Sequence, residues 1–155
     1  MCMQNISNTW KSRYLDLAER ISHWSKDPST KVGCIVIGKD GQVLSQGFNG
    51  FPRKFSDDLE LYVMRETKYR FIVHAEMNAI YHATLNGISL KNSVFFIHGL
   101  HVCHECAKAL VQVGAKGVVM RQTKETSTKW AESFHYAQEI LTQGGIEYEI
   151  ISSES

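Results

Sequence analysis

The 155-residue chain carries almost no net charge and contains no long hydrophobic run. Its 17 Lys and Arg side chains face 16 Asp and Glu side chains, so the formal net charge is +1. So weak a field cannot hold a long polyanion by counterion release, and we expect a small-molecule substrate and no nucleic-acid partner. No segment approaches the roughly 18 apolar residues that span a bilayer, and no lipidation motif is present. We therefore expect no membrane partner.

Cysteine is scarce as well, with four residues in the chain. Four cysteines can form two disulfides, but residues 1–10 lack the basic stretch and apolar core of a secretory signal. Reduced thiols in a cytosol are then the default, and we expect a cytoplasmic protein, in the host cytoplasm if the chain is viral. With 43% apolar residues, the chain is long enough for one well-covered core and too short for two. Residues 1–155 are predicted to form a single domain.

Hydrophobic periodicity predicts both helices and strands. Apolar residues at three- and four-residue intervals predict an amphipathic helix over residues 10–24, and two β-branched runs around Asp40-Gly41 predict a hairpin over residues 32–47. The later pattern predicts helices at residues 61–69, 75–86, 103–113 and 128–143, and strands at residues 94–97, 117–120 and 146–151. Two strands followed by alternating helices and strands imply an α/β protein, a three-layer α/β/α sandwich with a central mixed five-stranded sheet.

Residues 48–60 are polar, contain Gly50 and Pro52, and follow neither period. They are predicted to form a loop that is long for a compact domain, and such loops tend to be functional. Asn49 follows a strand, so its amide can donate to and accept from a sugar hydroxyl or a base carbonyl. An ordinary Asn-Gly turn is the competing interpretation, and the residues alone leave the two equally open.

The strongest chemical signal joins His74 to the pair Cys103-x-x-Cys106. A catalytic zinc takes three protein ligands from imidazole and thiolate groups and leaves its fourth position to water. Both motifs are predicted at helix N-termini, where free backbone N–H groups and the helix dipole favour thiolate over thiol. We expect a strand before each helix, so that the ligands meet in a crevice at the carboxyl ends of the strands.

Glu76 lies two residues after His74, within the same turn but pointing in a different direction. Zinc lowers the pKa of its water towards about 7, and Glu76 can accept that proton and deliver it to a ring nitrogen and a departing amine. A lone C-x-x-C is more often a structural zinc site or a redox pair, but a structural site would want a closing fourth ligand. A His-x-Glu followed by Cys-x-x-Cys is instead the signature of the zinc deaminases of nucleobases.

The chain resembles the deoxycytidylate deaminases of the cytidine deaminase superfamily, over roughly residues 10–150. Four segments carry the resemblance by their order and spacing: SKDPSTKVGCIVIG, GFNGFPR, VHAEMNAI and CHECAKALVQVGAKGVV. The resemblance implies a cytidine deaminase-like fold in which His74, Cys103 and Cys106 bind Zn²⁺ and Glu76 is the acid/base. One residue departs from the family pattern, which usually has proline immediately before the first cysteine, where this chain has Val102.

The resemblance also implies an activity and its regulation. The reaction would be hydrolysis of dCMP to dUMP and ammonia, which supplies dUMP for dTTP synthesis. The protein would be a homo-oligomer, commonly a homohexamer, activated by dCTP and inhibited by dTTP, with Mg²⁺ accompanying the regulatory triphosphate. The family uses a GYNG-like motif around its nucleotide regulatory site, which favours substrate or effector contact for Asn49 and Gly50.

The phosphate of a nucleotide should meet a cation or a helix N-terminus. Residues 65–70 form the densest basic cluster and immediately precede the metal motif, although each cation alone is more often a solvated surface charge. The candidates are Lys31, Arg53, Lys54, Arg65, Lys68, Arg70, Arg121 and Lys129. Three histidines near the cysteine pair are interpreted as loop or pocket-wall residues rather than ligands of a second zinc: His98, His101 and His104. Trp130 and Phe134, four residues apart on a predicted helix, are interpreted as residues of the core or of a subunit contact.

Other functions remain open at this point. The same zinc chemistry serves deaminases of cytidine, dCTP, RNA or single-stranded DNA, including those that act on adenine. Near-neutral charge and the lack of a basic extension argue against strand binding, which needs a positive groove with stacking aromatics. An inactive zinc-binding module is the alternative from another class, and Glu76 argues against it, because a module does not need a carboxylate beside an open metal position.

Overall fold

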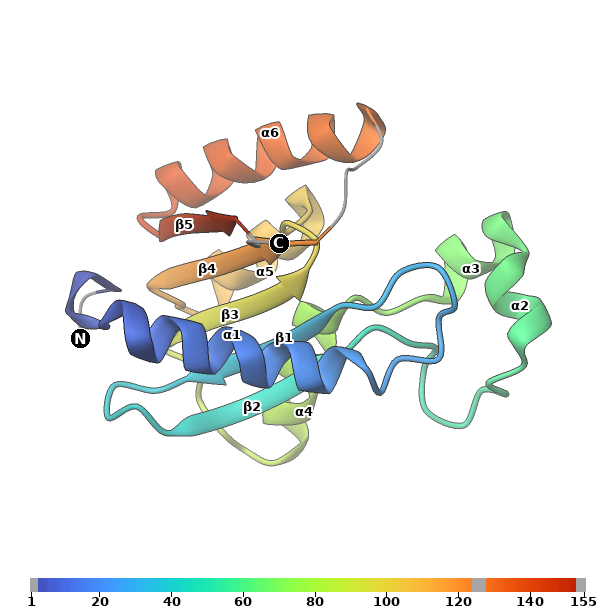
Figure 1. Ribbon diagram of the computed structural model, residues 1–155, viewed down its shortest axis with the longest axis horizontal. Coiled ribbons are helices and arrows are strands. Elements are labelled where there is room, and N and C mark those ends of the chain that lie inside the picture. The colour runs from blue at the N-terminus through green and yellow to red at the C-terminus, as the bar shows by residue number, and fades with distance from the viewer. Residues whose placement is uncertain (1–2, 124–127, 153–155) are drawn as a thin grey trace.

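A mixed five-stranded sheet runs through the centre of the computed structural model, which describes residues 3–123 and 128–152 (Figure 1). The strands are β1 (Gly33–Ile37), β2 (Val43–Phe48), β3 (Val94–Gly99), β4 (Gly117–Gln122) and β5 (Glu147–Ser152). Their order in the sheet is β2-β1-β3-β4-β5. The β1 strand is antiparallel to both of its neighbours, whereas β3, β4 and β5 are parallel. The predicted mixed sheet is confirmed.

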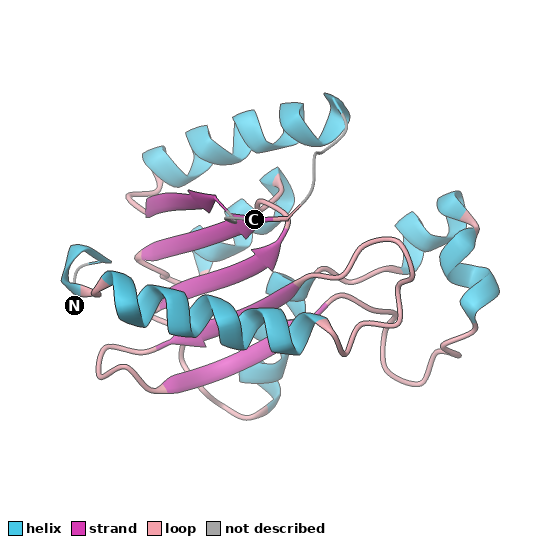
Figure 2. Ribbon diagram, in the orientation of Figure 1, coloured by secondary structure: helices cyan, strands magenta, loops and turns pink. Residues whose placement is uncertain are grey.

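Helices cover both faces of this sheet (Figure 2). The helices are α1 (Asn8–Ser22), α2 (Leu59–Val63), α3 (Arg65–Phe71), α4 (Ala75–Leu85), α5 (His104–Gln112) and α6 (Thr128–Gln143), preceded by a 3₁₀ turn at Met3–Asn5. The α1 helix packs on one face, α4 and α5 pack on the other, and α6 lies against α5 beyond β5. The three-layer α/β/α sandwich is therefore confirmed. None of the described helices has the length and apolar composition of a membrane-spanning segment.

The central strand β3 is buried along its whole length because it contributes to two cores. Successive side chains of a strand point to opposite faces of a sheet. Phe95 and Ile97 accordingly pack with α4 and α5, whereas Val94 and Phe96 pack with α1. This two-sided burial makes β3 a fixed base for the loop that follows it.

The segment between β2 and α4 differs from expectation. The single helix predicted over residues 61–69 is wrong, because Met64 adopts φ −81° and ψ 92° and separates α2 from α3. The two short helices project from the body as an arm, which we call the α2–α3 arm (Figure 1). The strand expected before α4 is also absent from the structure: α4 follows α3 and a single bridge between Gly50 and Val73. Of α4 and α5, only α5 directly follows a strand of the sheet, β3.

Two glycines allow helices to approach the sheet closely. A Cβ atom on Gly47 of β2 would lie 2.4 Å from the Ala75 carbonyl oxygen and 2.4 Å from the Ala79 nitrogen, both in α4. A Cβ atom on Gly33 of β1 would lie 1.9 Å from the Ala18 carbonyl oxygen in α1. Because these neighbours are backbone atoms of packed helices, they cannot move aside. Gly47 therefore determines how close the first turn of α4 comes to the sheet.

Candidate metal centre and active site

Two helix starts bring an imidazole and two thiols together. His74 is the N-cap of α4, Cys103 is the N-cap of α5, and Cys106 lies in the first turn of α5. The Nδ1 atom of His74 lies 3.4 Å from the Sγ atom of Cys103 and 3.4 Å from that of Cys106. The three donor atoms all lie within 4.8 Å of one another. Elsewhere in residues 3–123 and 128–152, no other trio of His, Cys, Asp or Glu donors comes as close.

This donor set fits a zinc ion. Zinc binds imidazole nitrogen at about 2.0–2.1 Å and thiolate sulfur at about 2.3 Å in tetrahedral geometry, which places neighbouring donors roughly 3.6 Å apart. The observed nitrogen-to-sulfur distances of 3.4 Å agree with that spacing without movement of either helix. One nitrogen and two sulfur donors from the protein also leave a fourth position, as catalytic zinc sites do. The geometry therefore supports Zn²⁺ as the cofactor.

The three donors shift one another's pKa values. A hydrogen bond with the Cys106 thiol, helped by His74, lowers the pKa of Cys103 to about 4. The pKa of Cys106 is raised, because its proton is held by the Cys103 thiolate and because it is buried. The hydrogen bond with Cys103 raises the pKa of His74. The start of a helix, where free N–H groups favour negative charge, further favours the thiolate form of Cys103.

Glu76 lies beside these donors and is buried, with 4% of its surface exposed. Burial raises the pKa of its carboxyl group above the ordinary value, and the positive charge of His74 opposes the shift. The carboxyl group also forms a hydrogen bond with the side chain of Cys106. A carboxyl group with a raised pKa, next to a metal position, is a stronger base than an exposed one and is suited to accept and return a proton.

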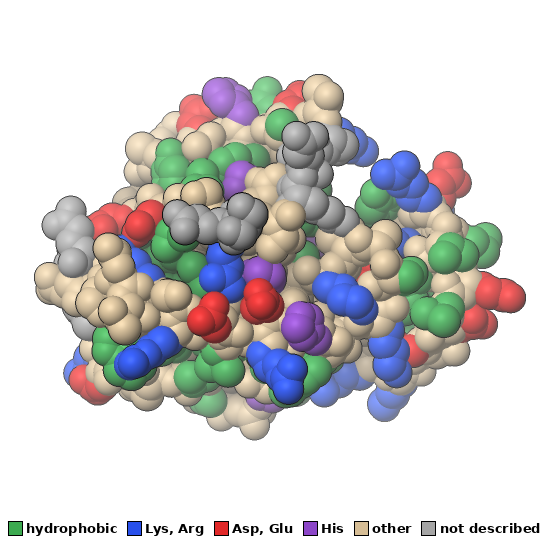
Figure 3. Space-filling view, viewed as in Figure 1, with side chains coloured by type: hydrophobic (Ala, Val, Ile, Leu, Met, Phe, Trp, Pro, Cys, Tyr) green, Lys and Arg blue, Asp and Glu red, His purple; other side chains and the backbone are tan. Residues whose placement is uncertain are grey.

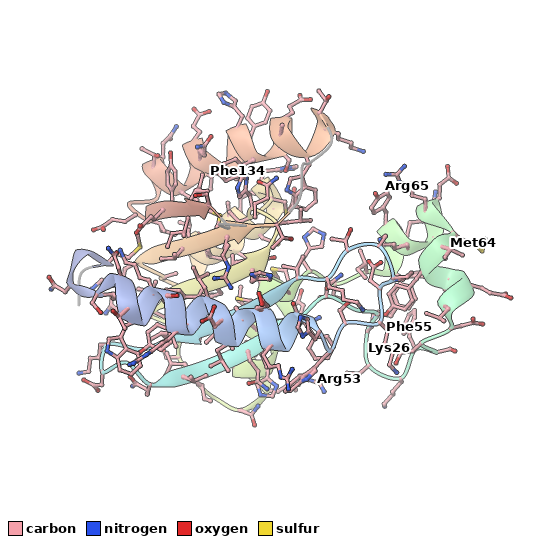
Figure 4. All side chains as sticks on the ribbon, in the orientation of Figure 1. Lys26, Arg53, Phe55, Met64, Arg65 and Phe134 are labelled. Atoms are coloured by element: carbon pink, nitrogen blue, oxygen red, sulfur yellow. The ribbon has the colours of Figure 1, made fainter. Side chains whose placement is uncertain are left out.

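The α6 helix covers the segment that carries the cysteines. The Oγ atom of Ser133 accepts a hydrogen bond from the backbone N–H of His104 at 3.1 Å and lies 2.7 Å from Nδ1 of the same residue. The ring of Trp130 lies 6.0 Å from that of His74, and the ring of Phe134 lies 4.2 Å from that of His101. Phe134 extends from α6 (Figure 4). Trp130 and Phe134 do pack on the core, as predicted. The apolar spacing of Trp130 and Phe134 did not indicate that they lie beside the metal donors. The sequence carried no signal for the hydrogen bonds of Ser133.

Val102, the residue that stands in place of the family's proline, is fully buried. Its backbone N–H, which proline would lack, donates to the sulfur atom of Met120 at 3.4 Å. Burial and this contact both anchor the chain immediately before Cys103.

The neighbouring histidines lie outside the donor trio of His74, Cys103 and Cys106. His98 accepts a hydrogen bond from Nε of Arg121 at 3.0 Å and lies 3.6 Å from a Glu19 oxygen. His101 stacks on Phe134, and His104 bonds to Ser133.

Asn49 has a framework role that the sequence did not indicate. Its Oδ1 atom accepts a hydrogen bond from the backbone of Val32 at 2.9 Å, and its Nδ2 group donates to the Thr30 carbonyl at 2.9 Å and to Asp27 at 3.5 Å. The residue is buried, and both amide hydrogens are engaged. The Asn-Gly turn interpretation is wrong, since Gly50 pairs with Val73. A nucleotide contact in which the Nδ2 group of Asn49 donates would have to break one of these internal bonds.

The basic candidates fall into two groups. Lys68 forms an ion pair with Asp27 at 2.7 Å, and Arg121 contacts Asp16 at 3.3 Å and Glu19 at 3.5 Å. The charges of these two cations are therefore already balanced by carboxylates, and the interpretation of both as solvated surface charges is wrong. The remaining six candidates are exposed: Lys31, Arg53, Lys54, Arg65, Arg70 and Lys129. The structure does not gather them at one point, since Arg65 and Arg70 lie on the α2–α3 arm and Lys129 on α6.

A cavity of about 440 Å³ opens at the end of β3, on the α1 side of the sheet. The end of α1, residues 28–31 and the end of β3 form its walls. Lys31, His23 and His98 line it together with the acidic residue Glu19, and none of the metal donors takes part. Figure 3 shows this face of the molecule, where acidic, basic and histidine side chains are interleaved.

The fold and the donor set together define a class, that of α/β/α enzymes with one histidine, two cysteines and a glutamate at a single metal site. Residues 8–122 match the family described as the cytidine and deoxycytidylate deaminase zinc-binding region. The chain therefore belongs to the cytidine and deoxycytidylate deaminase family.

Individual relatives agree with this assignment. The chain is 37% identical over 141 residues to an uncharacterized deaminase from the luxG 3′ region of Aliivibrio fischeri, over 89% of this chain and 90% of the relative. It is 32% identical over 145 residues to a probable deoxycytidylate deaminase of Caenorhabditis elegans, over 90% of this chain and 68% of the relative. Among solved structures, dCMP deaminase from the cyanophage S-TIM5 in complex with dCMP and dUMP superposes with a TM-score of 0.78 at 27% identity, over 95% of this chain and 100% of that chain.

Proposed function

We propose that this protein is a zinc-dependent deaminase that hydrolyses dCMP to dUMP and ammonia, with residues 1–155 acting as one catalytic domain. The observation that carries the proposal is the buried Glu76 next to the cluster of His74, Cys103 and Cys106. The choice of dCMP among related substrates rests on the cyanophage enzyme, whose structure holds dCMP and dUMP and covers 95% of this chain.

In the proposed mechanism, His74, Cys103 and Cys106 hold the zinc ion and Glu76 moves the proton. A bound zinc ion supplies Lewis acidity, which lowers the pKa of water towards about 7. Glu76 accepts the proton of the attacking water, whose oxygen bonds to C4 of cytosine. Glu76 then returns this proton to the ring nitrogen and transfers a second to the departing amine, so that ammonia leaves without a covalent enzyme intermediate.

The raised pKa of Glu76 suits this double role. A carboxylate with the ordinary pKa of about 4.3 is a weak base for the proton of a water whose pKa is about 7, and a raised pKa brings the two pKa values closer. Burial among the metal donors reduces that imbalance.

Nucleotide contacts are part of the same proposal. Lys31, Arg53, Arg65 and Arg70 are the exposed cations proposed to meet phosphate groups of the substrate or an effector. Gly50 and Asn49 lie at the base of the loop that would face the nucleotide, and we assign Asn49 an indirect part because its amide is engaged internally.

We also propose regulation by dCTP as activator and dTTP as inhibitor, with Mg²⁺ bound to the triphosphate, in a cytoplasmic homohexamer. The cavity of about 440 Å³ beside Lys31 is large enough for a small ligand and separate from the metal donors, as an effector site must be. Its lysine and histidines can donate hydrogen bonds to an anionic ligand, and Glu19 is the acidic member of the lining.

The test follows the loss of cytosine absorbance by the purified zinc-loaded protein. Substrates are dCMP, CMP, deoxycytidine, dCTP and a short cytosine-containing single strand, each with and without dCTP or dTTP. We expect turnover of dCMP and a response to both triphosphates that requires Mg²⁺. Turnover of the single strand or of deoxycytidine in preference to dCMP would contradict the substrate assignment. Saturation curves that neither triphosphate changes would contradict the regulation alone.

A further inference from the structure

Asp27 and Lys68 form an ion pair inside the protein that the proposed mechanism does not use. Lys68 Nζ lies 2.7 Å from Asp27 Oδ2, and the side chains are 11% and 1% exposed. A buried pair adds little net stability in general, because both charges lose their hydration. The geometry that the pair imposes on its surroundings is therefore the feature to explain.

Asp27 joins three segments that are distant in the sequence. Its Oδ1 atom accepts hydrogen bonds from the backbone N–H groups of Ser29 at 2.9 Å and Thr30 at 3.3 Å. Its Oδ2 atom receives Lys68 from α3 and the Asn49 amide, at 3.5 Å, from the end of β2. Lys68 also donates to the hydroxyl of Ser29 at 3.0 Å. The carboxylate is thus a junction between the loop after α1, the end of β2, and α3.

Two of these segments, the end of β2 and α3, are connected closely to His74. Asn49 is followed by Gly50, whose N–H and C=O bond to Val73 at 3.1 and 2.8 Å. Val73 is the residue before His74, and Lys68 lies six residues before it on α3. His74 has no side-chain capping bond of its own at the start of α4. Its backbone position therefore depends on the segments that Asp27 ties together.

We propose that Asp27 and Lys68 are positioning residues for His74, because their ion pair clamps residues 68–73 onto the end of β2 and the loop after α1. They do not touch the reacting atoms in this scheme; they act through the histidine. The proposal deepens the proposed function, on which it rests for the identity of the metal. It predicts that breaking the pair loosens the metal site before it affects nucleotide binding.

The test measures zinc transfer from the full-length zinc-loaded protein to a colorimetric chelator, without substrate, for Lys68→Met, Lys68→Arg and Asp27→Asn. Loss of groups that orient metal ligands typically lowers metal affinity or activity about 10- to 100-fold. We expect Lys68→Met and Asp27→Asn to release zinc about 10- to 100-fold faster, and to lower kcat for dCMP while leaving KM unchanged. Lys68→Arg keeps the charge and should restore most of the wild-type rate.

The chain offers a matched control in Lys26→Met. Lys26 forms an ion pair with Asp57 at 2.8 Å, but these side chains are 60% and 45% exposed. Exposed pairs contribute little, so this variant should release zinc at the wild-type rate. An equal effect of Lys26→Met and Lys68→Met would overturn the proposal.

A single variant that leaves one buried charge unpaired can fail to fold, so the double variant Asp27→Asn/Lys68→Met is measured too. It removes both charges, and we expect it to fold and to release zinc faster than the wild type by the same 10- to 100-fold. Zinc release from the folded double variant at the wild-type rate would refute the proposal. Failure of the wild-type protein to deaminate dCMP would refute the proposed function. The zinc-release result would still stand, because that assay uses no substrate.

Discussion

Glu76 is a carboxyl group that the fold buries next to two sulfur atoms and an imidazole. Such an environment disfavours negative charge, and the pKa of Glu76 is raised accordingly. An apolar residue at this position would make the folded protein more stable than a buried carboxyl group does. The proton transfer proposed for Glu76 gives a reason for a carboxyl group at this position.

The first prediction concerns the proton transfer by this residue. Glu76→Gln keeps the shape of the side chain but cannot accept a proton, so zinc binding and folding should persist while kcat falls by about 10²–10⁴-fold. Metal content by atomic absorption and turnover of dCMP are measured on the same sample. Cys106→Ala is the counterpart and should lose zinc and activity together. Normal turnover by Glu76→Gln would contradict the role of Glu76 in proton transfer. Stoichiometric zinc in Cys106→Ala would contradict the role of Cys106 as a zinc ligand.

The second prediction at this scale concerns pH and Asp27. Burial pushes the pKa of Asp27 upward, but hydrogen bonds and charge from Lys68 and Ser29 outweigh it, so the pKa in the folded protein lies below the ordinary value. The carboxyl group therefore binds its proton more weakly in the folded than in the unfolded chain. Its stabilisation is complete above the unfolded pKa of about 3.9 and is lost as the pH falls through the folded pKa.

Urea titrations of the wild type and Asp27→Asn from pH 7 to pH 3 test this sign. The difference in free energy of unfolding should be constant above about pH 5 and should shrink below about pH 4. Other groups titrate alike in the two proteins and cancel. A difference that grows as the pH falls would show that the pKa of Asp27 is raised on folding.

At the scale of elements, the metal site depends on how closely α4 approaches the sheet. His74 and Glu76 both lie at the start of this helix, and Gly47 of β2 faces the backbone of its first turns. A side chain at position 47 must displace the helix, because its nearest neighbours are backbone atoms. The glycine thus links sheet packing to the position of two chemical groups.

Gly47→Ala is the prediction that follows. The new methyl group should destabilise the fold by about 1–3 kcal/mol, or more, and should weaken zinc binding by shifting α4. Gly38→Ala is the matched control, since its Cβ would meet only the end of the flexible Gln42 side chain, at 2.7 Å. Chemical denaturation and zinc affinity are compared for both. Equal stability of the two variants would mean that α4 adjusts freely.

For the whole molecule, the formal net charge of +1 and the interleaved charges on the α1 face leave no continuous positive groove on that face (Figure 3). A small anionic substrate can be recognised by a few local cations, whereas a strand requires a continuous positive groove. This balance favours a free nucleotide.

Assembly is the prediction at this scale. The resemblance to deoxycytidylate deaminases leads us to expect a homohexamer, about six times the 17.6 kDa of the chain. Sedimentation velocity at micromolar concentration, with and without dCTP and dTTP, measures the mass directly. A single species of 17.6 kDa under all conditions would contradict the expectation.

Local patterns in the sequence were enough for most of the fold and for the centre of the site. Each sheet strand, and each helix outside the α2–α3 arm, carries a local signal: a helical period in α1, a β-branched run in β1, or a glycine after the last turn in α4 and α5. His74, Glu76, Cys103 and Cys106 could be found because their chemistry requires fixed spacings within single helix starts.

Tertiary structure alone decided what depends on contacts between distant segments. The division of the α2–α3 arm at Met64, the internal bonding of Asn49 and the burial of Lys68 leave no local pattern, since a lysine on a short helix has the same sequence signature whether solvated or paired. Asp27 meets Lys68 across 41 positions of sequence only because the sheet brings the loop after α1 beside α3. A charged side chain can be buried only beside a partner of opposite charge, and only the fold places that partner next to it.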